Sequence, residues 1–137
     1  MRKRSKARES ALQILYQIDV TGGPVDAVLN QYWYTRNRNP EVVDFANEIV
    51  KGTTEHLSEI DAIISQHSEN WEIGKMPIID RNILRFAIYE ILYMDDIPPK
   101  VTIDEAVDLA NNFGTPNSGK FINGILDKIM TLNTKNN

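Results

Sequence analysis

Apolar side chains recur along the chain at steps of three and four residues, which is the spacing of one face of an α-helix. This spacing predicts a first helix over about residues 5–21, with Ser5 as its N-cap. The helix is expected to stop at the sequence Gly22, Gly23, Pro24. Its buried stripe is predicted to contain Ala7, Ala11, Ile14 or Leu15, and Ile18.

A second, shorter helix is expected from Pro24, and the polar run 35–39 is expected to be a loop. Asn39 followed by Pro40 is a strong helix start, because asparagine accepts from unpaired backbone N–H groups and proline lacks the donor that would be unsatisfied. The helical pattern then continues to about His67. That length is unusual for a globular helix, so we expect a bend or break at Gly52.

The second half of the chain begins with a connector, residues 69–77, in which Trp71 is expected to anchor the segment on the core. Residues 78–94 are apolar on most of the helix circumference, which predicts a central helix with neighbours on several sides. Thr102 and Glu105 have the spacing of a capping box, and the helix that they begin is expected to end at a left-handed Gly114.

The last helix is expected to be capped by Asn117 or Ser118 and to bury a side that includes Phe121. No segment shows sustained two-residue alternation, so the sequence predicts an all-α fold. The length of 137 residues suits a single domain. The connector indicates two small helical bundles packed together, an N-terminal one of about residues 1–68 and a C-terminal one of about residues 69–137.

Composition argues against several chemistries. The chain has no cysteine and only two histidines, His56 and His67, which lie eleven positions apart, so we expect no metal site and no cofactor. Its acidic pairs occupy expected helix ends and polar faces, which gives no indication of a catalytic acid and base. No apolar run approaches the roughly 20 residues of a membrane span. We expect a cytoplasmic protein. We also expect it to have no catalytic residues.

Charge is distributed unevenly along the chain. The net charge is −4, yet five of the 15 basic residues lie in the first eight positions with no acid among them: Arg2, Lys3, Arg4, Lys6 and Arg8. A basic arm on an acidic body favours docking to a polyanion, with a solvated, frayed terminus as the alternative. Five phosphate contacts to a single strand would give a slope of log K against log salt of about −3.5. Gln13 and Tyr16 on the first helix could bond to or stack on an unpaired base, although Tyr16 could equally pack in the core.

The stretch FGTPNSGKF, residues 113–121, differs by one residue from a nucleotide-binding P-loop, since Phe121 stands where serine or threonine would bind magnesium. A P-loop also follows a β-strand, whereas a helix is expected before this stretch. Residues 113–121 are therefore predicted to be a turn between two helices.

Four blocks of sequence together resemble the NusB family of bacterial transcription antitermination factors. The match runs from about Arg2 to Ile129 and is carried by ARESALQILYQID, DRNILRFAIYEILY, KVTIDEAVDLANNFG and SGKFINGILDKI, in this order. The resemblance implies two helical subdomains, no catalytic activity and no cofactor. It also implies binding to single-stranded boxA RNA of ribosomal RNA leader transcripts, together with the small-subunit ribosomal protein NusE, within an RNA polymerase antitermination complex.

Residue by residue, the resemblance places RNA contacts on the basic arm, on Tyr16 and on the turn before the last helix. On that turn they are Phe113, Asn117, Ser118, Lys120 and Phe121. Asp80 matches a position near the NusE interface. Several relatives carry an acidic residue where Asn117 stands, so the local charge differs. The sequence leaves open whether Phe121 belongs to the core or contacts a base, and whether the chain forms a homodimer.

Two other functions are alternatives to antitermination. A related use of this fold is the RNA-binding front end of ribosomal RNA methyltransferases, but the chain offers no glycine-rich cofactor-binding segment. A bundle that binds only proteins is the third alternative.

Overall fold

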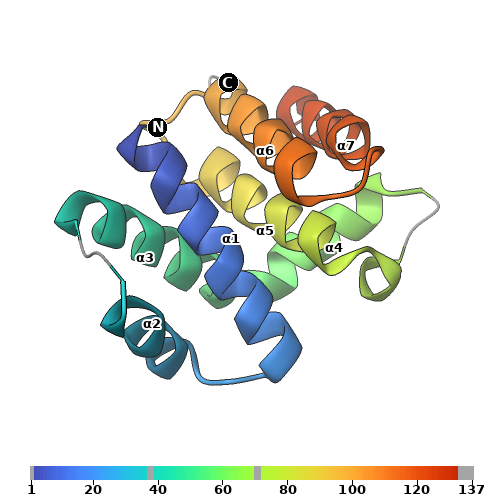
Figure 1. The fold of residues 1–137 in the computed structure, drawn as a ribbon. Coiled ribbons are helices and arrows are strands. Elements are labelled where there is room, and N and C mark those ends of the chain that lie inside the picture. Colours follow the sequence, from blue (N-terminus) through green and yellow to red (C-terminus); the bar gives the residue numbers. More distant parts are fainter. Residues whose placement is uncertain (1, 37–38, 70–71, 133–137) are drawn as a thin grey trace.

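The computed structural model describes residues 2–36, 39–69 and 72–132, and within these ranges the chain forms seven α-helices, one short 3-10 helix and no strand (Figure 1). This confirms the predicted all-α fold. The first half contains α1 (Lys3–Thr21), α2 (Val25–Tyr34), α3 (Pro40–Glu55) and α4 (Leu57–His67). The second half contains the 3-10 helix η1 (Ile73–Lys75), α5 (Ile78–Tyr93), α6 (Pro99–Phe113) and α7 (Ser118–Leu132).

Helix α5 is the central element, as its apolar circumference predicts. It packs against α1, α3, α4, α6 and α7, and Figure 1 shows it between α1 and the α6–α7 pair. Its fully buried apolar side chains are Ile83, Leu84, Phe86, Ala87, Ile88 and Ile91. A single apolar core includes side chains from both halves of the chain, so the division into subdomains 1–68 and 69–137 stays a prediction.

Two of the predicted helix boundaries are confirmed by their cap geometry. Gly22 follows α1 in the left-handed conformation, with φ of 69°, and its N–H donates to the carbonyl oxygen of Ile18 at 2.8 Å. The Oδ1 atom of Asn39 accepts from the N–H of Glu41 at 3.0 Å, at the start of α3. Both residues act through local backbone geometry, which is why the sequence alone identifies them.

The predicted roles of Ser5 and Gly52 are wrong. Helix α1 begins at Lys3, so Ser5 lies inside it, and its hydroxyl donates to the carboxylate of Glu105. Gly52 lies within α3, which continues to Glu55 and meets α4 only at His56. A Cβ atom at Gly52 would overlap the ring of Tyr89, so this glycine permits close packing of α5 on α3.

The predicted capping box at Thr102 and Glu105 is also wrong, because α6 begins earlier, at Pro99. The hydroxyl of Thr102 instead donates to Oε1 of Glu90 at 2.8 Å. Gly114 does follow α6, but its φ of −95° is not left-handed. The predicted anchor Trp71 lies outside the described residues.

Candidate nucleic-acid interface

The exposed cations of the basic arm differ in how far their charge is already paired. Lys3 Nζ lies 2.8 Å from a carboxylate oxygen of Glu41. Arg4 lies 3.8 Å from a carboxylate oxygen of Asp96, and its guanidinium carbon is 4.5 Å from the centre of the Phe45 ring. Arg2 and Lys6 are exposed and form no ion pair with a described residue. Within the described part of the arm, Arg2 and Lys6 are therefore the cations most available to a phosphate.

The prediction that Arg8 contacts RNA phosphate stays a prediction, and the position of this side chain does not favour it. Its side chain is 2% exposed and bonds to Glu90 through two nitrogens, each at 2.8 Å, and to Glu105 at 3.0 Å. Burial by itself lowers the pKa of Arg8, but the hydrogen bonds and charges of Glu90 and Glu105 outweigh it and raise that pKa above its ordinary value. Arg8 thus joins α1 to α5 and α6 and has no donor left on the surface.

The contact between Arg8 and Glu105 also sets the register of α1 against α6. The two helices run in the same general direction (Figure 1). Tyr16 follows Arg8 by eight residues and Phe113 follows Glu105 by eight residues, so both rings lie toward the same end of the helix pair. Their exposed fractions are 39% and 43%. The tertiary structure therefore brings two exposed aromatic rings from distant parts of the sequence toward the same end of the α1–α6 pair.

A groove of about 680 Å³ lies between α1 and α6, and it has an acidic wall. Its lining carboxylates are Glu9, Asp104, Glu105 and Asp108, whereas Arg2 supplies positive charge at its N-terminal end. Like charges repel, so phosphate groups are favoured at the arm and disfavoured along the middle of this groove.

The turn between α6 and α7 is fixed by a buried serine. The hydroxyl of Ser118, which is 1% exposed, donates to Oδ1 of Asp80 at 2.7 Å and accepts from the N–H of Thr115 at 2.9 Å. A Cβ atom on Gly114 would collide with this hydroxyl. The Ser118 hydroxyl therefore holds the turn from inside, and the prediction that Ser118 contacts RNA stays a prediction.

The other predicted residues of this turn are accessible to different degrees. Asn117 and Lys120 are exposed, in keeping with contacts to RNA. Phe121 is half-buried and packs against the core, while its remaining surface lines a cavity of about 300 Å³ beside Asn117. The ring thus contributes to the core and also borders the surface. None of these placements by itself shows a contact with RNA, and these sites remain predictions.

Asp80 also lines that cavity, together with Pro77, and is 4% exposed. Burial raises the pKa of its carboxyl, and the hydrogen bond from Ser118 opposes the rise. A side chain so enclosed offers little surface of its own, so the predicted role of Asp80 near a partner interface would act through the turn that it holds. That role stays a prediction.

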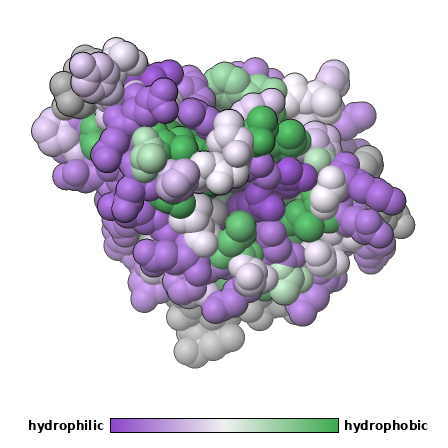
Figure 2. Space-filling view, turned by 90° about the horizontal axis from the view of Figure 1, so that it is seen from below, coloured by the Kyte–Doolittle hydropathy of each residue, from purple (hydrophilic) through white to green (hydrophobic). Residues whose placement is uncertain are grey.

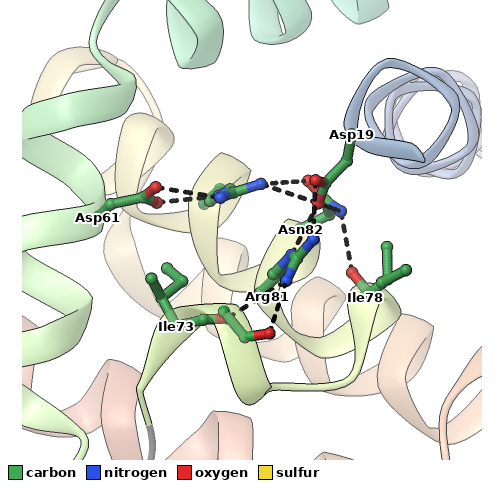
Figure 3. Close-up of polar contacts among 8 residues, drawn as sticks. Asp19, Asp61, Ile73, Ile78, Arg81 and Asn82 are labelled. Carbon is green, nitrogen blue, oxygen red and sulfur yellow. Dashed lines mark hydrogen bonds and ion pairs between the residues drawn. The ribbon is translucent and has the colours of Figure 1, made fainter. Parts of the chain in front are cut away.

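Sequence reasoning missed a polar network at the far end of α1. Asp19 accepts from Arg81 at 2.7 and 2.8 Å, from Asn82 at 2.9 Å and from Arg85 at 3.0 Å, while Arg85 also bonds to Asp61 (Figure 3). Burial by itself raises the pKa of Asp19, but the bonds from Arg81 and Asn82 and the two positive charges hold it below its ordinary value. The network joins α1, α4 and α5, and its partners are too far apart in sequence for spacing to identify them.

Sequence reasoning also missed a cavity between α1 and α2, lined by Gln17, Tyr34 and Arg36 among others. The run of three aromatic residues followed closely by an arginine in YWYTR, residues 32–36, is the signal that could have found it. Within the described ranges, no cluster of three or more acidic, histidine or cysteine side chains could hold a metal ion, and no helix has the length and apolarity to span a bilayer.

The fold and the site define an all-helical protein that carries exposed cations and exposed aromatic rings on α1 and α6. Comparison with known proteins gives the family. Residues 5–131 match the model of the NusB family, and the chain belongs to that family.

Curated relatives match over nearly their whole length. The chain is similar to the transcription antitermination protein NusB of Desulforamulus reducens, with 46% identity over 127 residues, covering 93% of this chain and 89% of the relative. The corresponding protein of Myxococcus xanthus is 44% identical over 133 residues, covering 94% and 95%.

Solved structures agree with the sequence relatives. NusB of T. maritima superimposes with a TM-score of 0.86 at 37% identity, covering 93% of this chain and 90% of that one. A NusB chain in a crystal structure of the antitermination factors NusB and NusE in complex with dsRNA gives a TM-score of 0.87 at 28% identity, covering 96% and 98%.

Proposed function

We propose that this chain is a transcription antitermination factor that binds boxA RNA together with NusE and promotes read-through by RNA polymerase. The observation that carries the proposal is the match, at 46% identity over 93% of the chain, to a protein named for transcription antitermination. The related NusB in complex with NusE and dsRNA supports the two classes of partner. On this proposal the protein acts in the cytoplasm, without catalysis and without a cofactor.

The arm supplies the part of the affinity that does not depend on sequence. Arg2 and Lys6 contact phosphates directly, whereas Lys3 and Arg4 must first exchange Glu41 and Asp96 for phosphate oxygens. Such contacts position the strand but carry no sequence information.

Sequence selection comes from the aromatic end of the α1–α6 edge. Unpaired bases stack on the exposed rings of Tyr16 and Phe113, and Asn117 and Lys120 on the following turn bond to base edges or backbone. NusE docks on the helical body near the turn that Asp80 holds, and the pair of proteins carries the RNA to the elongating polymerase.

A titration with boxA RNA and a scrambled RNA of equal length, each with and without NusE, tests this function. We expect tighter binding of boxA, with a further gain when NusE is present. Equal affinity for both RNAs under all conditions would favour a bundle that binds only proteins.

A second titration tests the arm. The charge reversals Arg2→Glu and Lys6→Glu should weaken RNA binding and leave helicity and NusE binding intact. Lys51→Glu, at an exposed position of α3, is the matched control for charge. RNA affinity that is unchanged by the two arm reversals would refute the role of the arm.

A further inference from the structure

A cavity of about 540 Å³ lies between α1 and α2. Its wall contains the amides of Gln17, Asn30 and Gln31, the rings of Tyr32 and Tyr34, and the guanidinium of Arg36, and it contains no carboxylate. Four other cavities on the described surface each include at least one acidic residue: Asp104, Asp80, Glu69 and Asp127, respectively. On a body with excess negative charge, this cavity is thus a place where a phosphate meets a cation without a competing acid.

Arg36 is held in a fixed orientation within this cavity. Its guanidinium carbon lies 3.8 Å from the centre of the Tyr32 ring, and Nη1 donates to the Tyr32 carbonyl oxygen at 2.8 Å. The Tyr32 hydroxyl in turn donates to Oε1 of Gln13 on α1 at 2.6 Å. Arg36 forms no ion pair with a described carboxylate, so a stacked, oriented guanidinium has donors available for a ligand.

Tyr34 provides an aromatic face at the same place. Its side chain is 78% exposed, and its ring makes no stacking or edge contact with another described ring. An aromatic ring, an oriented guanidinium and several amides are the groups that proteins use to stack and hydrogen-bond an unpaired base. A cavity of this volume lies within the range that holds a small ligand.

The exposed face of α1 connects this cavity to the basic arm. Arg2, Lys6, Gln13 and Gln17 follow one another at steps of four and seven residues, which places them on one face of the helix. Lys6 and Gln17 are separated by about 16 Å along the helix axis. Figure 2 views the molecule from below, the side on which α2 and the end of α1 lie, and hydrophilic side chains surround several hydrophobic patches there.

We propose that the cavity between α1 and α2 binds an unpaired nucleotide of single-stranded RNA that flanks the segment held by the arm and by Tyr16. The proposal rests on the proposed RNA-binding function and extends its site onto α2. The base stacks on Tyr34, the amides of Asn30 and Gln31 bond to its edge, and Arg36 pairs with the adjoining phosphate.

The test compares two RNAs by fluorescence anisotropy: the boxA core, and the same core extended by several unpaired nucleotides at both ends. Titrations use the full chain with NusE and, separately, without it. We expect the extended RNA to bind at least about fivefold more tightly, because stacking one base contributes on that order or more. Tyr34→Ala and Arg36→Ala should each remove most of this gain while leaving affinity for the core unchanged.

Two further variants sharpen the result. Arg36→Lys keeps the charge but loses the planar stack on Tyr32, so it should retain only part of the gain. Lys128→Ala, which removes an exposed cation from α7, should retain all of it. Far-ultraviolet circular dichroism of each variant verifies that the helices are intact.

Several outcomes would overturn the inference, and they separate it from the proposed function. Equal affinity of the unmodified chain for core and extended RNA would refute the cavity as a site and leave core binding in place. A gain that persists in Tyr34→Ala and Arg36→Ala would locate the flanking nucleotide elsewhere. Failure of both RNAs to bind would refute the proposed RNA-binding function and, with it, this extension.

Discussion

Arg8 and Glu90 form a buried, two-pronged ion pair in which Nε and Nη2 each donate to one carboxylate oxygen at 2.8 Å. Their side chains are 2% and 0% exposed. Thr102 donates to the same carboxylate from α6, so side chains of three helices meet at this point. Arg8 faces inward here. Because Lys6 and Arg2 precede it by two and six residues, the helical periodicity places their side chains on the outward side.

We expect Arg8→Met to lower the free energy of unfolding by about 3–5 kcal/mol, since it leaves the charge of Glu90 buried without its main partner. The double variant Arg8→Met/Glu90→Leu should recover most of the loss, because neither buried charge then remains. Urea denaturation of the single and double variants measures both values. Equal losses in the two variants would contradict the assigned cost of the unpaired charge.

The unequal pairing of the arm predicts unequal salt dependence. Arg2→Ala and Lys6→Ala should each flatten the slope of log K against log salt by about 0.7. Lys3→Ala should flatten it less, since Glu41 already offsets that charge. Glu41→Gln should strengthen RNA binding by freeing Lys3. RNA titrations at several salt concentrations give the slopes, and equal changes in slope for the three cation variants would contradict the ranking.

Gly52→Ala should lower the free energy of unfolding by about 1–3 kcal/mol, because its methyl group would overlap the ring of Tyr89. In the background of Tyr89→Leu the same change should cost much less, which a double-mutant cycle measures. Gly124→Ala is the matched control, since this glycine of α7 has open space around its Cβ position. For Gly124→Ala we expect the free energy of unfolding to rise by up to about 1 kcal/mol, because alanine has the higher helix propensity.

The network around Asp19 predicts a dependence of stability on acid. Its pKa is lowered in the folded state, so the stabilisation is present above the unfolded-state pKa and is lost as the pH falls through the folded-state pKa. Asp19→Asn should therefore cost about 1–3 kcal/mol near neutral pH and less in strong acid. Urea midpoints between about pH 6 and pH 2 measure this difference. A constant difference across that range would contradict the lowered pKa.

The contribution of Asp80 to stability should depend on pH in the opposite sense to that of Asp19. Its pKa is raised in the folded state, so its contribution is fully present below the unfolded-state pKa and is lost as the pH rises through the folded-state pKa. Asp80→Asn should thus lower the free energy of unfolding least at neutral pH and most in acid. The same urea series measures it, and a profile parallel to that of Asp19→Asn would contradict the assignment.

Sequence by itself determined the features of this protein that depend on near neighbours. The three- and four-residue spacing of apolar side chains identified the helices, and the caps at Gly22 and Asn39 followed from local backbone geometry. The continuous apolar circumference of residues 78–94 identified the central helix. The four blocks of sequence identified the family, which the match over residues 5–131 confirms.

The tertiary structure decided which polar groups remain available on the surface. Arg8 was indistinguishable in sequence from the other cations of the arm, because Glu90 lies 82 residues away and only packing of α1 on α5 brings them together. Ser118 and Asp80 were hidden in the same way by a bond across 38 residues. Helix formation follows from local spacing, whereas burial and pairing depend on contacts between distant segments, and these contacts decide which side chains remain accessible to a ligand.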